Sequence, residues 1–168
     1  MTIKNQTVEE FLEQVADKNP TPGGGSVAAV TAALAASLVE MVCNLTIGKK
    51  GYEEVEARVK NISQKVSEIR LELMDLADAD SEAFQKVMEA HKSKDNSKIK
   101  AALYWAIEIP DKTKRLSEEV QAMALEIAKI GNKNAYSDAV SAESLANAAI
   151  EAAGENIEIN KKALAGLV

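Results

Sequence analysis

Apolar residues recur at helical spacing along most of this chain, and polar or glycine-containing stretches divide them into separate segments. Thr7 begins a Thr-x-x-Glu capping sequence that apolar residues follow at helical spacing, which predicts a first helix over about residues 7–18. A second helix is expected from about Ser26 to Ile47, and its segment Val27–Val39 has almost no polar residue on any face. A helix that is apolar all round belongs in the middle of a bundle.

The third predicted helix, from about Tyr52 to His91, is the longest and has the most regular pattern. Its apolar residues alternate in steps of four and three, a heptad pattern typical of helices that pack nearly antiparallel in a bundle. The series is Val55, Val59, Ile62, Val66, Ile69, Leu73 and Leu76, and the same steps continue to Asp80, Ala83 and Val87. A carboxylate therefore occupies a core position of the series.

Asp80 is the charged residue in this otherwise apolar series. Because burial of an unpaired charge is costly, we expect its carboxyl group to be hydrogen-bonded, protonated or exposed to a polar cleft. A functional carboxylate is one interpretation. A partnered carboxylate that fixes helix register, or one at a bundle end that meets water, is the other. The neighbouring Asp78 and Glu82 lie on other faces of the helix and are expected to be solvated.

Two further helices are expected in the C-terminal half of the chain. The fourth begins near Ser97, is kinked or broken by Pro110, and ends at Gly131. The last follows a polar stretch in which Ser137 or Asp138 is the expected cap. The fold prediction is a single all-α domain over residues 1–168, an up-and-down bundle of about five to six helices with one long heptad-patterned helix.

Composition supports helix packing and argues against two classes of partner. Apolar residues make up 46% of the 168 residues, with only one Trp, three Tyr and two Phe, and the net charge is −6. A general nucleic-acid binder would carry a basic face, so no nucleic-acid partner is expected. The apolar run Val27–Val39 is shorter than the roughly 20 residues of a membrane span, and the N-terminus does not resemble a signal peptide. No membrane partner is therefore expected.

The cysteine and histidine counts bear on compartment and metal binding. The one cysteine, Cys43, has no disulfide partner and lies in the apolar second helix, which favours a small core residue in a reducing cytoplasm. The one histidine, His91, lies in a polar turn and is expected at the surface. A helical di-metal carboxylate site uses two Glu-x-x-His pairs, so a single histidine disfavours a metal centre.

Two polar stretches are candidates for chemistry. In Pro20–Ser26 the prolines keep the chain extended, and three consecutive glycines let other groups approach the backbone. Ser26 is the expected N-cap of the second helix, whose free N–H groups favour anions and polarised oxygens. Taken alone, the glycines are more simply a linker or a tight turn. The second stretch, Asn132–Asp138, combines amides, a lysine, a hydroxyl and a carboxylate, which is more than helix capping requires.

Three separated segments, Pro20–Ala29 (PTPGGGSVAA), Leu76–Phe84 (LADADSEAF) and Gly131–Asp138 (GNKNAYSD), together resemble the cyclodeaminase/cyclohydrolase family. Their order and approximate spacing also match, and Asn156–Asn160 is similar to the family's closing asparagine-rich stretch. The resemblance extends over nearly the whole chain. Many members continue with a further helix after this stretch, whereas this sequence ends soon after it.

The resemblance implies an all-α bundle that forms a homodimer, with a folate-binding groove near the protomer interface. It also implies one of two reactions at the one-carbon unit of tetrahydrofolate. A cyclodeaminase converts 5-formiminotetrahydrofolate to 5,10-methenyltetrahydrofolate and ammonia, and a cyclohydrolase adds water to the methenyl bridge to give 10-formyltetrahydrofolate. The tetrahydrofolate derivative is the substrate, and no metal or other cofactor is implied. The sequence does not separate the two reactions.

Carried over residue by residue, the family's acid–base aspartate falls on Asp80, with Asp78 as the second candidate. A half-buried carboxylic acid with a raised pKa can protonate a departing amine near neutral pH. The expected substrate-binding residues come from both polar stretches: Pro22, Gly23, Gly24, Gly25, Ser26, Lys133, Asn134, Ser137 and Asp138.

Each group of these residues has an expected role. The glycine backbone would approach the substrate closely, Lys133 would meet the glutamate carboxylate of folate, and Asn134, Ser137 and Asp138 would hold the pterin or orient water. The alternative function is a non-catalytic helical bundle that binds folate or a partner protein. Such a bundle is expected to have an all-apolar seam, and Asp80 interrupts the seam here.

Overall fold

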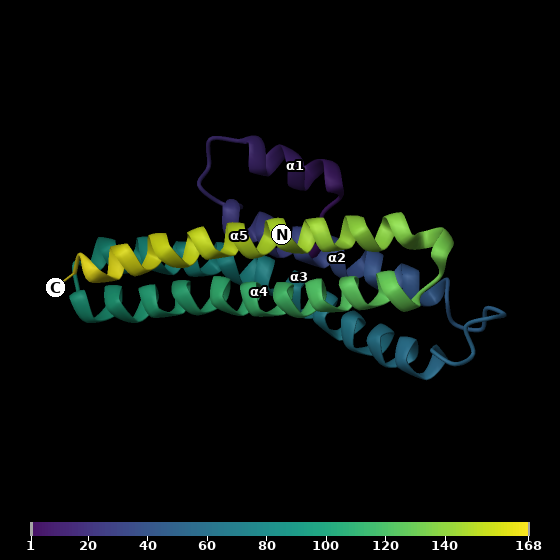
Figure 1. The fold of residues 1–168 in the computed structure, drawn as a ribbon. Helices are drawn as coiled ribbons and strands as arrows, with labels where there is room; N and C mark the ends of the chain where they lie inside the picture. The colour runs from purple at the N-terminus through teal and green to yellow at the C-terminus, as the bar shows by residue number, and fades with distance from the viewer. Residues whose placement is uncertain (1, 168) are drawn as a thin grey trace.

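The computed structural model describes residues 2–167, which form an elongated helical bundle (Figure 1). These residues contain no strand, and the predicted all-α bundle is confirmed. The α-helices are α1 (Val8–Ala16), α2 (Gly24–Asn44), α3 (Glu56–Ser93), α4 (Asn96–Ile130) and α5 (Tyr136–Ala165), with short 3₁₀ helices η1 (Ile3–Asn5) and η2 (Lys133–Ala135).

The bundle consists of three long helices and one shorter one. Helices α3, α4 and α5 run up and down its length, α2 lies among them in one half, and α1 stands outside (Figure 1). Because α2 has 21 residues and α3 has 38, α2 begins beside the middle of α3. The far end is therefore made only by α3, α4 and α5, around a small second core of Ala90, Ile99 and Leu103.

Helix α2 is the central helix of the bundle and packs against α3, α4 and α5. By length and composition α2 is long and apolar enough for a membrane span, contrary to the expectation from the shorter run Val27–Val39, but 56% of its apolar window is buried inside the bundle. The helix is longer than that run because residues on both sides of it are also helical. Its buried side chains are mostly small, which lets neighbouring helices approach closely: Ala28, Ala29, Ala32, Ala33, Ala35, Ala36, Val39, Val42 and Cys43.

Helix α3 buries the apolar series that the sequence pattern identifies. The side chains at these positions face the core and are at most 6% exposed: Val59, Ile62, Val66, Ile69, Leu73 and Leu76. Further along the series, Asp80 is half-buried and Ala83 is buried again. Asp80 is therefore a carboxylate on the inner face of the helix.

The helix ends differ from expectation at two points. The capping box at Thr7 is present, with reciprocal hydrogen bonds between Thr7 and Glu10. Ser26, however, does not cap α2, because the helix already begins at Gly24 and leaves Ser26 inside its first turn. Ser137 and Asp138 likewise do not cap α5, which starts at Tyr136 without a side-chain cap. The hydroxyl of Ser26 is consequently free for another role.

Of the kink or break expected at Pro110, the break is wrong, because helix α4 continues through this residue. Proline has no backbone N–H, and the carbonyl of Ala106 therefore loses its usual helical donor four residues later. The side-chain amide of Asn160 on α5 replaces it, since its Nδ2 donates to the Ala106 carbonyl over 2.7 Å. This bond allows a proline inside a buried helix and fastens α5 to α4.

Replacement of Asn160 by alanine should lower the free energy of unfolding by about 1–3 kcal/mol, because a half-buried carbonyl is left without a donor. The Pro110→Ala variant restores a backbone N–H for the same carbonyl. Asn160→Ala should therefore cost measurably less in the Pro110→Ala background, a difference that chemical denaturation of the four proteins in the cycle measures. Equal costs in both backgrounds would show that Asn160 does not act through the Ala106 carbonyl.

Candidate active site

The first turn of α2 meets the middle of α3 through a hydrogen bond between Ser26 and Asp80. The Ser26 hydroxyl donates to Oδ2 of Asp80 over 2.9 Å, and the Ser26 side chain is completely buried. Of the three environments expected for Asp80, this contact shows the hydrogen-bonded one. Its partner is the serine at the end of the glycine-rich segment, so the first two family-like segments meet at one place in the fold.

Gly25 provides the space that the Asp80 carboxyl group occupies. A Cβ atom at Gly25 would lie 2.0 Å from Oδ1 of Asp80 and 2.6 Å from Cγ. Real Cβ atoms do not come this close to other heavy atoms, so any side chain at Gly25 requires the carboxyl group to move. Glycine is needed here for close approach between a backbone and a functional group.

Burial raises the pKa of the Asp80 carboxyl group above its ordinary value, because removal from water disfavours the charged form. Hydrogen bonds from the hydroxyl and the backbone N–H of Ser26 act in the opposite direction but are the smaller effect. The protonated acid is therefore favoured more than in a solvated aspartate. A carboxyl group of this kind can donate a proton and take it back during a reaction.

Ser81 joins the same cluster from the next position of α3. Its hydroxyl oxygen lies 3.2 Å from that of Ser26, and its side chain lines a cleft of about 400 Å³. Thr21 and Pro22 from the glycine-rich segment line the same cleft. Ser81 is not among the predicted site residues, although it follows Asp80 directly and lies within the family-like segment Leu76–Phe84.

Asp78 has a different environment from the solvated position expected for it. Its Oδ1 accepts a hydrogen bond from the backbone N–H of Ile3, and its Oδ2 is buried without a partner among residues 2–167. The nearby ion pair between Lys4 and Asp75, at 2.7 Å, also fastens the N-terminal segment to α3. Asp78 thus holds η1 against the bundle at the edge of the cleft, whereas Asp80 faces α2.

Helix α5 brings Asn156 to the other side of the glycine-rich segment. A Cβ atom built on Gly24 would lie 3.5 Å from Nδ2 of Asn156. The same Nδ2 donates to the carbonyl of Ala152, which leaves the side-chain oxygen of Asn156 available as an acceptor. Asn156 belongs to the asparagine-rich stretch noted in the sequence but is not a predicted site residue.

The second polar stretch lies at the opposite end of α2. Its anchor is the buried Asn132, whose Nδ2 donates to the carbonyl of Leu45 and whose backbone N–H donates to the Thr46 hydroxyl. Leu45 directly follows α2, about 20 residues from Gly25, which is roughly 30 Å at the helical rise. Within one chain, the structure therefore keeps Lys133, Asn134, Ser137 and Asp138 away from Asp80.

The residues of this second stretch are mostly exposed. Lys133, Asn134 and Ser137 are exposed, and Asp138 is half-buried in the first turn of α5. The backbone N–H of Lys133 donates to the Tyr52 hydroxyl over 3.0 Å and so supports the turn. The lysine side chain takes no part in this bond. The stretch is thus a fixed polar surface rather than part of the Asp80 cluster.

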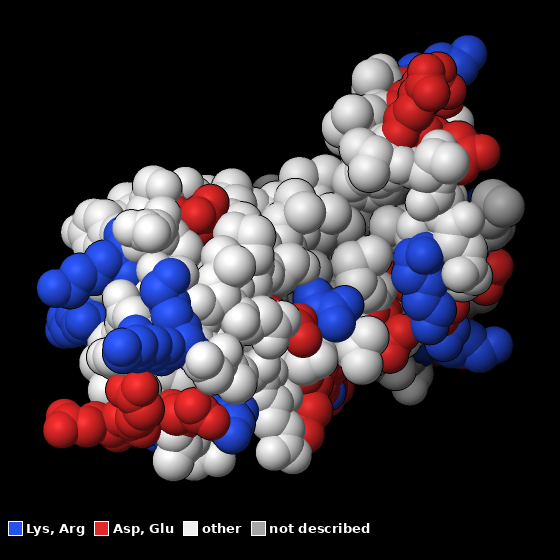
Figure 2. Space-filling model, turned by 90° about the vertical axis from the view of Figure 1, so that its right-hand side faces the viewer, with Lys and Arg blue, Asp and Glu red and all other residues white. Residues whose placement is uncertain are grey.

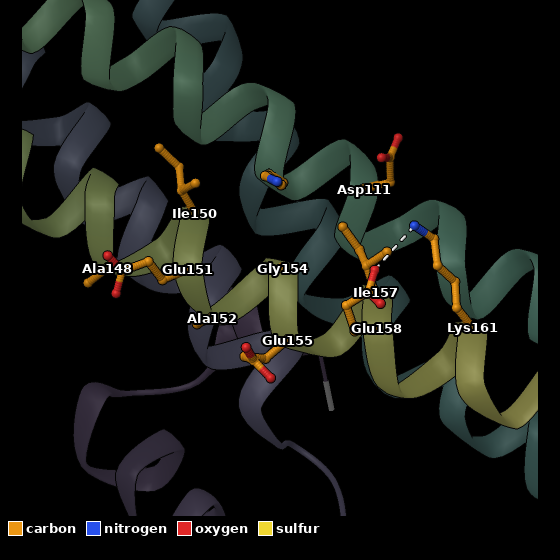
Figure 3. A pocket seen from close by; sticks show the side chains of 11 residues that line it. Asp111, Ala148, Ile150, Glu151, Ala152, Gly154, Glu155, Ile157, Glu158 and Lys161 are labelled. Carbon is orange, nitrogen blue, oxygen red and sulfur yellow. Dashed lines mark hydrogen bonds and ion pairs between the residues drawn. The ribbon is translucent and has the colours of Figure 1, made fainter.

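A hollow of about 900 Å³ lies between α4 and α5 and is not lined by Asp80 (Figure 3). Glutamates and one ion pair, between Glu158 and Lys161 at 3.3 Å, line it around Gly154. It contains none of the predicted site residues. Burial raises the pKa of the Cys43 thiol to about 12, so this cysteine is not a candidate nucleophile.

Comparisons with known proteins agree on one family. The family model described as formiminotransferase-cyclodeaminase matches residues 7–165. A methenyltetrahydrofolate cyclohydrolase of Methylorubrum extorquens is 41% identical, over 95% of this chain and 81% of that protein. The formimidoyltransferase-cyclodeaminase of Mus musculus is 27% identical over 96% of this chain, which spans 31% of the mouse protein.

A solved structure gives the same result. The crystal structure of formiminotetrahydrofolate cyclodeaminase from Thermotoga maritima superposes with a TM-score of 0.93 and is 40% identical in sequence. The superposition covers 96% of this chain and 81% of that one. Fold and sequence therefore match together over nearly the whole chain.

The Gly25→Ala variant should displace the Asp80 carboxyl group and lower the free energy of unfolding by about 1–3 kcal/mol, as overpacking does. Its hydrogen bond to Ser26 should be lost at the same time. Thermal unfolding measures the first effect, and the ¹³C chemical shift of the Asp80 carboxyl carbon reports the second.

Gly154 provides a matched control for this substitution. It also lies inside a helix, but a Cβ atom there would have no neighbour within 4 Å. Gly154→Ala should therefore raise the free energy of unfolding by about 0.4–1 kcal/mol through helix propensity and unfolded-state entropy. If Gly25→Ala were also stabilising, the tight contact with Asp80 would be refuted.

Proposed function

The chain belongs to the formiminotransferase-cyclodeaminase family, and on that basis we propose that it is an enzyme of folate one-carbon metabolism. It acts at the carbon that joins N5 and N10 of tetrahydrofolate, as a formiminotetrahydrofolate cyclodeaminase, a methenyltetrahydrofolate cyclohydrolase or both. Relatives of about 40% identity carry each of these names. The observation that carries the proposal is the half-buried carboxyl group of Asp80, held against Gly25 and Ser26.

Both reactions pass through a tetrahedral carbon bonded to N5 and N10, which also carries the departing amine in the deamination and a hydroxyl group in the hydrolysis. In the deamination, N10 attacks the formimino carbon and ammonia leaves. In the hydrolysis, water attacks the methenyl carbon and the bond to N5 breaks. Each leaving nitrogen must gain a proton as its bond to carbon breaks, and Asp80 supplies it as the general acid. Its raised pKa keeps a proton available nearer to neutral pH than a solvated aspartate would.

Asp80 rather than Asp78 is assigned this role because of their partners. Asp78 accepts the backbone N–H of Ile3 and so serves to hold the N-terminal segment. Asp80 is held by Ser26 beside the glycine-rich segment, where the first N–H groups of α2 have no side-chain cap. Such N–H groups suit a carbonyl oxygen of the pterin or the oxygen that develops on the attacked carbon.

We propose that the substrate is a tetrahydrofolate derivative, as the family implies. Proton transfer, addition and elimination account for every step of both reactions, so we propose that neither a resident metal nor a redox cofactor takes part. A cytoplasmic location fits this substrate and the free thiol of Cys43.

A second copy of the chain would complete the site. The polar stretch Lys133–Asp138 lies roughly 30 Å from Asp80 in the same chain, too far to contact the same pterin ring. In a two-fold dimer, the stretch from one chain can reach the Asp80 cluster of the other. The proposed homodimer therefore has two sites, each built from both chains.

The outer face of α2 supports a two-fold arrangement. Leu34, at the midpoint of α2, is 55% exposed, and Met41 and Leu45 are exposed on the same side. A two-fold axis near Leu34 would pair this face with its copy in the antiparallel sense. The end of one α2 that carries Leu45 would then lie beside Gly25 of the other. Next to this face, a groove between α1 and α2 has mostly uncharged walls (Figure 2).

The proposed activity is tested by following methenyltetrahydrofolate absorbance with the purified protein. Absorbance should appear when 5-formiminotetrahydrofolate is supplied, or decay when the methenyl compound is supplied, faster than without protein. Asp80→Asn should slow the observed reaction by about 10²–10⁴-fold, the usual contribution of a general acid. Asn keeps the shape of the side chain, so circular dichroism and folate-induced thermal stabilisation should stay close to those of the wild type.

A wild-type rate from Asp80→Asn would remove Asp80 from the mechanism. If the folded wild-type protein changed neither absorbance, the family chemistry would be absent. Thermal stabilisation by folate without turnover would then identify a folate-binding bundle.

The shared site is tested by mixing two inactive variants, Asp80→Asn and Lys133→Ala/Asp138→Asn, after brief unfolding and joint refolding. Mixed dimers contain one site with both defects and one intact site, so activity should return to about a quarter of the wild-type value. Each variant refolded alone is the control. Absence of recovery, with dimers confirmed by light scattering, would show that each site lies within one chain.

A further inference from the structure

Three oxygen-bearing side chains form a continuous row from the inside of the bundle to the cleft. Oδ2 of Asp80 accepts from the Ser26 hydroxyl at 2.9 Å, and the Ser26 oxygen lies 3.2 Å from the Ser81 oxygen. Asp80 and Ser81 are neighbours on α3, while Ser26 comes from α2 and is completely buried. Ser81 lines the cleft of about 400 Å³ and so places the end of the row at solvent.

The direction of the Asp80–Ser26 and Ser26–Ser81 hydrogen bonds follows from the number of hydrogens that each oxygen carries. A serine hydroxyl has one hydrogen, and that of Ser26 is given to the Asp80 carboxylate. Ser81 must therefore donate to Ser26 when Asp80 is ionised. When Asp80 carries a proton on Oδ2, both bonds reverse, so that Asp80 donates to Ser26 and Ser26 donates to Ser81. The row thus has two complete arrangements that differ by one proton.

We propose that Ser26 and Ser81 relay protons between Asp80 and the cleft. The relay rests on the proposed function, since it needs Asp80 as the acid and base of the reaction. Transfer outward moves the Asp80 proton to the Ser26 oxygen, the Ser26 hydrogen to the Ser81 oxygen, and the Ser81 hydrogen to water in the cleft. Ser81 acts through Asp80 and is a positioning residue rather than a catalytic one.

The relay matters for only one of the two reactions. In the deamination, the formimino group enters as its protonated cation, and the proton lost by N10 is the one that the departing amine gains, so the methenyl cation and neutral ammonia form with no proton left over. In the hydrolysis, water brings two hydrogens and N5 keeps one. The other is released, because the methenyl cation becomes a neutral formyl product. Asp80 collects this surplus proton from the hydroxyl of the tetrahedral intermediate and must pass it on before the next turnover.

The surroundings of Asp80 favour this exit. Oδ1 lies against the backbone of Gly25, whereas Oδ2 has the Ser26 hydroxyl as its partner. Among the residues that line the cleft, the charged ones are Asp78 and Glu82, both acidic and both on α3. The negative charge of these carboxylates at the mouth of the row favours movement of a proton in this direction.

The relay is tested with Ser81→Ala, which removes the outer hydroxyl and keeps Asp80 and Ser26. Turnover of methenyltetrahydrofolate should fall on the order of tenfold more than turnover of 5-formiminotetrahydrofolate. Imidazole buffer, a small proton acceptor, should restore part of the lost hydrolysis rate. Ser81→Thr keeps a hydroxyl at the same position and should recover most of it without imidazole.

Ser144→Ala is the matched control, because it removes an exposed helical serine whose hydroxyl donates to the Val140 carbonyl of its own helix. It should change neither rate. A second measurement uses the wild-type protein and so does not depend on the folding of any variant. The hydrolysis rate, plotted against the fraction of heavy water in the solvent, should follow a curve rather than a straight line, because more than one proton moves in the same step.

The possible results separate the relay from the proposed function. Equal loss of both activities in Ser81→Ala, without rescue by imidazole, would give Ser81 a purely structural role and overturn the relay. A linear dependence on heavy water, or a protein that deaminates without hydrolysing, would also overturn it. None of these results touches the role of Asp80, which falls only if Asp80→Asn keeps the wild-type rate.

Discussion

The contact between the Asp80 carboxyl group and the first turn of α2 is the constraint on which the site depends. Gly25 must lack a side chain because a Cβ atom would lie 2.0 Å from the carboxyl oxygen, and the completely buried Ser26 donates its hydroxyl to the same carboxyl group. The cost of placing a carboxyl group among packed helices is offset by hydrogen bonds from Ser26, and burial shifts the carboxyl group toward its protonated form. The chemistry proposed for the protein uses the same proton.

Helix lengths place this contact where a substrate can approach. Because α2 is shorter than α3, its N-terminus opens beside the middle of the bundle rather than at a capped end. The long helices pass this point and carry the fold onward, and the bond from Asn160 to the carbonyl freed by Pro110 joins α4 to α5 beyond it. The candidate site thus lies inside the bundle because α2 begins partway along it.

The sequence predicted the helices, and it identified Asp80 because a carboxylate interrupts an apolar heptad series. It did not predict what Ser26 does: a serine after three glycines usually caps a helix, and only the tertiary contact with α3 shows another partner. Asp78 was expected in solvent because its helical face is polar, yet the N-terminal segment folds back over it. Helical spacing describes one helix at a time, and these residues are determined by what a distant segment places beside them. The same limit applies to Lys133–Asp138, which the family resemblance groups with Asp80 although the chain holds them apart.

The most direct test of this account is a ¹³C titration of the Asp80 carboxyl carbon by NMR in the folded protein, with Asp80→Asn used to assign the signal. Burial between α2 and α3 predicts a pKa above the ordinary aspartate value of 3.8. It also predicts a return toward that value in Gly25→Ala, where the carboxyl group is displaced toward solvent. A pKa at or below 3.8 in the wild-type protein would mean that Asp80 is an ordinary ionised carboxylate. It would then hold no proton to give near neutral pH, and the account of the site would be wrong.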